Sequence, residues 1–196
     1  HVHAGAEELG RVYQGELLIN SGMPQIAAAL AAMAPVAARA WSEWTRSAHA
    51  DYVEWTKPRT VPGKLQLWDV VDFLKRRLPA DAILTNGAGN YSSWLHRFYP
   101  HRMFRTQLAP TSGAMGYGVP AAIAAKIVHP ERTVVSWNGD GCFLMCGQEL
   151  ATAAQYGANV IFIVVNNGMY GTIRMHQERE YPARVHGTAL VNPDFA

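Results

Sequence analysis

Three short segments of the sequence combine glycine with asparagine or aspartate at the point where an apolar run ends. They are NGAGN at 86–90, NGDG at 138–141 and NNG at 166–168. Glycines let a ligand approach the backbone closely, and exposed backbone N–H groups favour anions, phosphate above all. Asp140 is an acidic residue among backbone donors that suit a phosphate. A hard cation that binds both its carboxylate and the phosphate oxygens would account for this position. The three segments predict a site for a diphosphate held through a metal ion.

Mg²⁺ suits these residues best, because it takes oxygen ligands, commonly one or two from protein side chains plus phosphate oxygens. Asp140 offers a carboxylate, and Asn166 or Asn167 offers an amide oxygen from the end of a neighbouring strand. Cys142 and Cys146 are four positions apart without a second Cys or His pair, which fits neither a zinc site nor a disulfide framework. We expect both to pack as thiols in a reducing compartment.

The elements that would position these residues alternate between strand and helix. An apolar run precedes each glycine segment, and continuous apolar runs are typical of parallel strands buried on both faces. A helical pattern at 64–79 precedes the first run, and two others stand between the runs, one after a glycine loop within 111–130 and one at 143–157. We predict an α/β fold with a doubly wound, mostly parallel sheet and helices on both faces. Ligands of such sheets bind beyond the carboxyl ends of the strands, so the three segments should share one crevice.

The remaining sequence suggests a smaller part before this sheet and a continuation after it. Residues 1–56 read as a strand end followed by two helices on either side of Pro35, and 57–64 is a linker rich in proline. Near the other end, Asn192 and Pro193 have the order of a helix N-cap and first helical residue. We therefore expect the start of a helix that continues beyond the given residues, and a chain truncated at both ends.

Composition restricts the function to small-molecule chemistry. With 196 residues and 49% hydrophobic content, the chain can bury one sizeable core plus a small appendage. Its formal net charge is only +2 and the basic residues are scattered, which argues against nucleic acid or an acidic membrane surface as a partner. No apolar run approaches a membrane span, and no signal peptide is visible, so we expect a cytoplasmic protein. The GAGN segment argues against a nicotinamide dinucleotide site, because it lacks the third glycine and the later acidic residue of that motif.

The GDG segment followed by NN resembles the thiamine diphosphate (ThDP) fingerprint of the pyruvate decarboxylase and acetolactate synthase superfamily. Residues 138–178 resemble the diphosphate-binding domain of acetolactate synthase-like enzymes, and TSGAMGYGVPAAIAA resembles the glycine loop under their cofactor. The segment YPARVHGTALVNPDF continues the likeness. The resemblance implies that 1–56 is the tail of a central domain and that 65–196 is the C-terminal ThDP-binding domain, incomplete at its end.

This resemblance implies ligands for the metal and the diphosphate. Asp140, Asn167 and the backbone carbonyl of Met169 would bind Mg²⁺. The cofactor would be contacted by the residues around the glycine segments, which are Ala88, Asn90, Tyr91, Gly139, Gly141 and Cys142.

It also implies roles closer to the reaction. Met115 would wedge between the two rings of the cofactor and enforce their bent form, in which the aminopyrimidine can act as an internal base. The carbonyl of Gly113 would accept a hydrogen bond from that aminopyrimidine. His176 stands where acetolactate synthases commonly have the tryptophan of RQWQ. The exchange predicts a different acceptor substrate, or none, with His176 close to the reaction.

The implied activity is that of a ThDP- and Mg²⁺-dependent carboligase or decarboxylase of 2-oxo acids, with FAD as a further cofactor where the central domain holds one. The family's active sites lie between subunits of a homodimer or homotetramer, where the neighbour's pyrimidine-binding domain contributes a glutamate. Because the sequence contains no such domain, we expect the chain alone to be inactive. The alternatives are a catalytically silent diphosphate-binding or assembly module, and an unrelated nucleotide-diphosphate binder.

Overall fold

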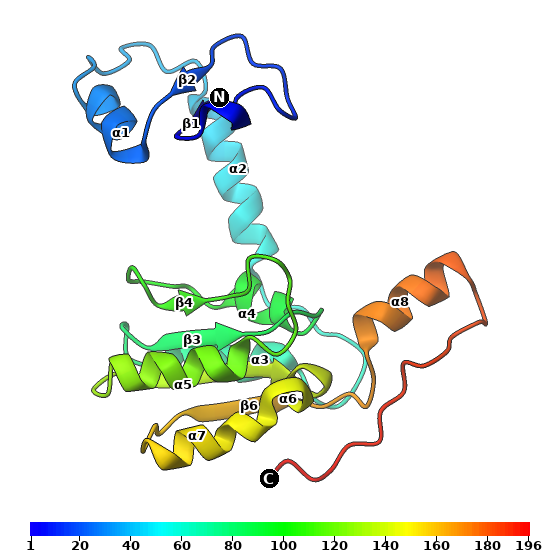
Figure 1. The fold of residues 1–196 in the computed structure, drawn as a ribbon. Coiled ribbons are helices and arrows are strands. Elements are labelled where there is room, and N and C mark those ends of the chain that lie inside the picture. The colour runs from blue at the N-terminus through cyan, green and yellow to red at the C-terminus, as the bar shows by residue number, and fades with distance from the viewer. The chain divides into compact units, whose positions relative to one another are not determined.

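A four-stranded parallel sheet is the centre of the larger of two units into which the chain divides. The computed structural model describes residues 1–196, and the units are His1–Tyr52 and Val53–Ala196 (Figure 1). In the larger unit the strands have the order β4-β3-β5-β6, and all neighbouring pairs are parallel. Their bounds are Ile83–Asn86 for β3, Gln107–Leu108 for β4, Val134–Gly139 for β5 and Ile161–Val165 for β6.

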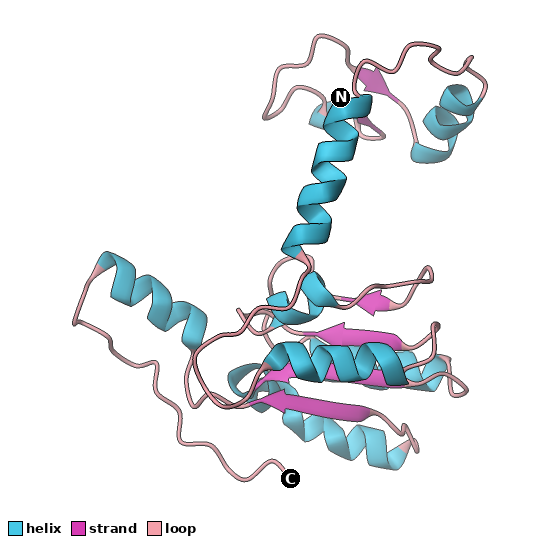
Figure 2. Cartoon of the chain, turned by 180° about the vertical axis from the view of Figure 1, so that it is seen from behind, coloured by secondary structure: helices cyan, strands magenta, loops and turns pink.

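Helices cover both faces of this sheet (Figure 2). Alternate residues of a strand point to opposite faces, so Leu84 and Trp137 pack with side chains of α3 and α4, whereas Ile83 and Val134 pack with α5. The helices of this unit are α3 (Leu67–Arg77), α4 (Ser92–Phe98), α5 (Gly118–Val128), α6 (Asp140–Cys146), α7 (Leu150–Gln155) and α8 (Gly171–Glu180). The predicted doubly wound parallel α/β fold is confirmed.

The strand order places a topological switch point between β3 and β5. After β3 the chain passes through α4 to β4 on one side, and after β5 it passes through α6 and α7 to β6 on the other. The loops that follow β3 and β5 therefore diverge at the carboxyl edge of the sheet. Such a divergence leaves a crevice, and open α/β sheets bind their ligands there.

The smaller unit has a two-stranded parallel sheet and helices. β1 (Val2–His3) pairs with β2 (Ile19–Asn20), and a 3-10 turn, Ala6–Glu8, lies between them. The two helices predicted on either side of Pro35 are α1 (Met23–Ala31) and α2 (Ser42–Trp55), the second of which continues into the larger unit.

One prediction of local structure was wrong. The single helix predicted for 143–157 is divided into α6, a 3-10 turn at Gly147–Glu149, and α7. Gly147 is a weak helix former. A Cβ on this glycine would lie 3.2 Å from the ring of Phe143. Residues 191–196 form no helix, and the side chain of Asn192 donates its amide hydrogens to Asp140 and Asn166.

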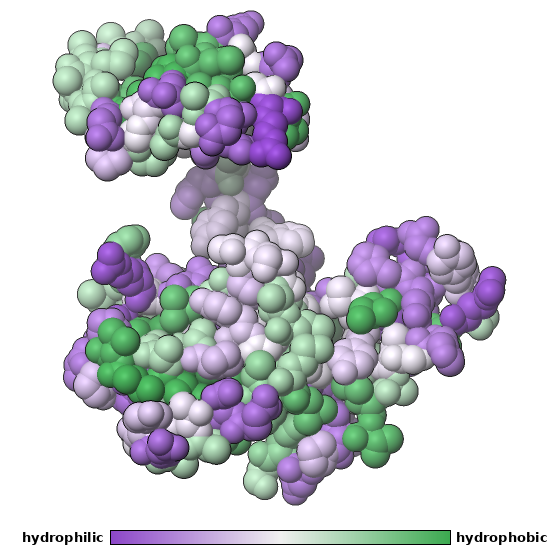
Figure 3. Space-filling view, in the orientation of Figure 1, coloured by the Kyte–Doolittle hydropathy of each residue, from purple (hydrophilic) through white to green (hydrophobic).

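The surface of the molecule mixes hydrophilic and hydrophobic residues over the face seen in Figure 3. On the larger unit, apolar side chains of α5, α6 and α7 remain partly open to solvent. They are Ile127, Val128, Leu144, Met145 and Leu150. None of the helices has both the length and the apolar character needed to cross a membrane.

Candidate cofactor site

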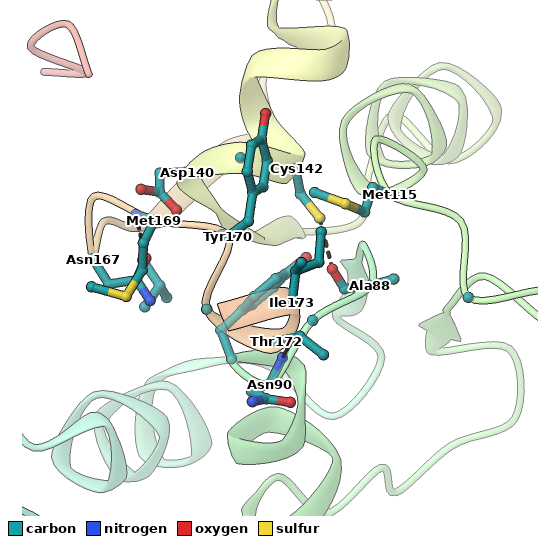
Figure 4. Close-up of a pocket in the computed structure, with 17 residues that line it drawn as sticks. Ala88, Asn90, Met115, Asp140, Cys142, Asn167, Met169, Tyr170, Thr172 and Ile173 are labelled. Carbon is teal, nitrogen blue, oxygen red and sulfur yellow. Dashed lines mark hydrogen bonds between the residues drawn. The ribbon is translucent and has the colours of Figure 1, made fainter. Parts of the chain in front are cut away.

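A cavity of about 240 Å³ lies at the carboxyl edge of the sheet, between the loops that follow β3, β5 and β6 (Figure 4). All residues predicted to contact the cofactor or the metal line it. These are Ala88, Asn90, Tyr91, Gly113, Met115, Gly139, Asp140, Gly141, Cys142, Asn167 and Met169. The structure therefore brings into one place residues that are up to 81 positions apart in the sequence, from Ala88 to Met169.

Glycines form part of the cavity wall, because neighbouring side chains lie so close to their backbone that a Cβ would have no room. A Cβ on Gly139 would be 2.7 Å from the ring of Tyr91, and one on Gly141 would be 2.6 Å from the ring of Tyr170. Gly113 has a φ of +68°, a conformation that favours glycine. The loops at these positions present backbone rather than side chains, as close binding of a phosphate requires.

Asp140 is the acidic residue of the cavity and is almost fully buried, with 3% of its surface exposed. It follows β5 directly and begins α6. Its Oδ2 accepts hydrogen bonds from the backbone N–H of Gly168 at 2.9 Å and from Nδ2 of Asn192 at 2.7 Å. Its Oδ1 accepts none, so one carboxylate oxygen remains available to a ligand in the cavity.

The two asparagines after β6 have different surroundings. Asn167 lines the cavity, and its Oδ1 accepts the backbone N–H of Met169 at 3.1 Å. Asn166 does not line it, and its Oδ1 accepts Nδ2 of Asn192 at 2.8 Å and the N–H of Gly168 at 3.2 Å. Of the two amides that the sequence offered, Asn167 is therefore the one placed to share a ligand with Asp140.

The donors at this site are suited to a hard cation. Nowhere in the chain do three or more His, Cys, Asp or Glu side chains gather, so the site is unlike those of zinc and other transition metals. A carboxylate, an amide and a backbone carbonyl are all oxygen donors, which magnesium and calcium prefer. The residues present thus fit Mg²⁺ that completes its coordination with phosphate oxygens and water.

Cys142 and Tyr91 join the loops after β3 and β5 at the base of the cavity. The buried thiol of Cys142 donates to the carbonyl of Ala88 at 2.9 Å, and Nε1 of Trp137 donates to the carbonyl of Tyr91 at 3.0 Å. Burial, followed by the neighbouring Cys142 thiol, raises the pKa of Tyr91 above its ordinary value. The Tyr91 hydroxyl therefore stays protonated, and Cys142 is the packing thiol that the sequence predicted rather than part of a disulfide.

Tyr170, Thr172 and Ile173 line the cavity but were missed by sequence reasoning. Their only signal was their position directly after the NNG segment. The hydroxyl of Thr172 accepts the backbone N–H of Asn90 at 3.1 Å (Figure 4). Asn90 was predicted to contact the cofactor, and its backbone N–H is thus already engaged.

His176 does not line the cavity. It lies on the exposed part of α8, where its Nδ1 is 2.9 Å from Nη2 of Arg179. The cavity gives no support to the predicted catalytic role of this side chain. Its neighbours Thr172 and Ile173, one turn earlier on α8, face the cavity instead.

The fold and the cavity define a doubly wound α/β protein with a glycine-lined cavity at the carboxyl edge of its sheet. Residues 87–196 match the family model described as "Thiamine pyrophosphate enzyme, C-terminal TPP binding domain", thiamine pyrophosphate being another name for ThDP. The chain belongs to this family.

Similar proteins include several acetolactate synthases. The acetolactate synthase large subunit of Corynebacterium glutamicum is 34% identical over all of this chain and 33% of its own length. The large subunit of Lactococcus lactis is 28% identical over all of this chain and 34% of its own length. The acetolactate synthase of Arthrospira platensis is 41% identical over 59% of this chain and 20% of its own length. The chain thus spans about a third or less of these relatives.

Proposed function

We propose that this chain supplies the diphosphate- and Mg²⁺-binding part of the active site in a ThDP-dependent carboligase or decarboxylase of 2-oxo acids. The observation that carries the proposal is the single cavity in which Asp140, Asn167 and the glycine segments meet. The family match and the acetolactate synthase relatives support the choice of cofactor and reaction class.

The charge of the cavity supports a metal ion as part of this function. Neither lysine nor arginine lines the cavity, and Asp140 provides its one carboxylate. A bound diphosphate would therefore meet no protein cation, and its charge would repel the carboxylate. A divalent ion between Asp140 and the diphosphate removes this conflict.

Particular groups of the chain would hold the metal and the cofactor. Asp140 Oδ1, the Asn167 amide and the carbonyl of Met169 would bind Mg²⁺, and the backbone of Gly141 and Cys142 would face the diphosphate. Met115 provides an apolar wall, since its Cε lies 3.5 Å from the Cβ position of Gly141. When bound, ThDP supplies an electron sink for the negative charge that decarboxylation of a 2-oxo acid leaves behind.

The test is a calorimetric titration of ThDP into the protein with and without Mg²⁺. We expect binding that requires Mg²⁺ and is lost in Asp140→Asn, which preserves shape while removing the charge. Glu131→Gln, an exposed carboxylate before β5, is the matched control and should bind as the wild type does. Unchanged affinity in Asp140→Asn, or tighter binding of ADP than of ThDP, would contradict the proposal.

We also propose that the protein works as a homodimer or homotetramer. The exposed apolar side chains of α5, α6 and α7 support association, because another copy of the chain could bury them. Sedimentation velocity of the wild type and of Leu144→Glu tests this. We expect an oligomer that the substitution weakens, and a wild-type monomer at all concentrations would contradict it.

A further inference from the structure

The segment 188–192 lies along the loop that follows β6. The backbone N–H of Tyr170 donates to the carbonyl of Thr188 at 2.8 Å, and the N–H of Leu190 donates to the carbonyl of Gly168 at 2.8 Å. Met169 and Ala189 form an antiparallel bridge between these bonds. Thr188 is buried, with 3% of its surface exposed. The segment is thus fixed to the loop that carries Asn167 and Met169.

Asn192, at the end of this segment, connects the loops after β5 and β6. Its Nδ2 donates to Oδ2 of Asp140 at 2.7 Å and to Oδ1 of Asn166 at 2.8 Å. The N–H of Gly168 donates to the same two oxygens, at 2.9 and 3.2 Å. Both partners of the Asn192 amide are acceptors, so its NH₂ group rather than its oxygen must face them.

These bonds hold the Asp140 carboxylate in one orientation and leave Oδ1 as the oxygen without a hydrogen-bond donor. With two donors on Oδ2, the carboxylate cannot rotate without losing both hydrogen bonds, and Oδ1 remains the oxygen available to a ligand. Mg²⁺ demands near-ideal octahedral geometry, so a ligand held in one orientation binds it better than a rotating one. The Asn192 amide also engages Oδ1 of Asn166, whereas Asn167 is the amide that lines the cavity.

We propose that Asn192 is a positioning residue for the metal, acting through Asp140 although it does not line the cavity. This inference rests on the proposed function, because it concerns the cation that Asp140 would bind. Partners that orient a metal ligand typically affect metal affinity by about 10–100-fold when they are removed. The sequence suggested another role for Asn192, that of a helix N-cap, which would use its oxygen instead of its NH₂ group.

The experiment measures two affinities in wild type, Asn192→Leu and Asn192→Ala. The first is the apparent affinity for Mg²⁺ at fixed ThDP, and the second is the affinity for ThDP at saturating Mg²⁺, both by calorimetry. Asn192→Leu keeps the approximate shape and removes the donors. Asn192→Ala is a second variant that should fold, because Asn192 lies outside the buried core. Val191→Ala is the matched control, since the Val191 side chain is fully exposed.

We expect Mg²⁺ affinity to fall about 10–100-fold in both Asn192 variants, while ThDP affinity at saturating Mg²⁺ stays within about twofold and Val191→Ala behaves as the wild type. Equal weakening of both affinities would assign Asn192 a merely structural role and overturn the inference. Unchanged Mg²⁺ affinity in the variants, with Mg²⁺-dependent ThDP binding in the wild type, would overturn the inference and leave the proposed function intact. A wild type that binds ThDP equally well without Mg²⁺ would overturn both.

Discussion

Gly118 shows how closely the backbone packs beneath the cavity. It is the first residue of α5 and lies against the ends of the two central strands. A Cβ there would be 2.4 Å from Oδ1 of Asn138 and 3.0 Å from backbone atoms of Asn86 and Gly87. Backbone cannot move aside as a flexible side chain can, so this contact fixes the distance between α5 and the strand ends that carry the site.

Gly118→Ala should therefore destabilise the protein. Overpacking of a dense interior costs about 1–3 kcal/mol, and we expect the free energy of unfolding to fall by that amount. Urea denaturation measures it, with Ala124→Ser on the exposed side of α5 as a control that should stay within about 0.5 kcal/mol of wild type. An unfolding free energy for Gly118→Ala equal to that of the control would show that the strand ends can shift.

At the level of elements, a buried polar network joins β3, β5 and α5. The hydroxyls of Thr85 and Ser136 both donate to the carbonyl of Gly118, at 2.7 and 3.0 Å, and lie 3.1 Å from each other. Nδ2 of Asn138 donates to Oγ of Ser136 at 2.8 Å. Hydrogen bonds are directional, unlike apolar contacts, so the network sets the register of α5 on the sheet and with it the position of the loop that carries Gly113 and Met115.

Ser136→Ala tests this network. It removes the acceptor of Asn138 Nδ2 and leaves a fully buried donor without a partner, which costs about 1–3 kcal/mol. Ser93→Ala, on the exposed side of α4, should have little effect. The comparison is made by urea denaturation, and equal stability of the two variants would mean that the Asn138 amide finds another partner.

On the scale of the whole molecule, burial is distributed unequally between the two units. Every buried residue lies between Val71 and Thr188, so the unit His1–Tyr52 has none. All six residues of β5 are buried, and this strand pairs on both sides, with β3 and β6. Stability should therefore differ along the chain, because local opening requires less free energy where few apolar contacts are lost.

Hydrogen–deuterium exchange followed by mass spectrometry measures this difference. We expect the amides of β5 to exchange slowest, at a rate close to that of global unfolding, and peptides from 1–52 to exchange much faster. Peptides from α2 serve as an internal comparison, because its amides are hydrogen-bonded but its side chains are not buried. Protection in 1–52 equal to that in β5 would show that the smaller unit is stabilised by contacts other than buried side chains.

The sequence by itself determined the fold and most of the cavity. Continuous apolar runs predicted the strands β3, β5 and β6, and each run was followed by glycine and a polar residue. Because parallel strands end at the same edge of a sheet, the residues after them had to converge there, however far apart they lie in the sequence. The glycine segments and Asp140 could thus be placed together before any coordinate was known.

Tertiary structure decided which side chains point into that cavity. A pattern of residue types does not fix loop conformation. It could not show that Asn167 lines the cavity while Asn166 contacts Asn192. It also could not show that α8 directs Thr172 and Ile173 toward the cavity and leaves His176 exposed. The hydrogen bond from Asn192 to Asp140 joins residues 52 positions apart. It depends on the pairing of one loop with another, and such pairing is set by the packed chain as a whole rather than by local periodicity.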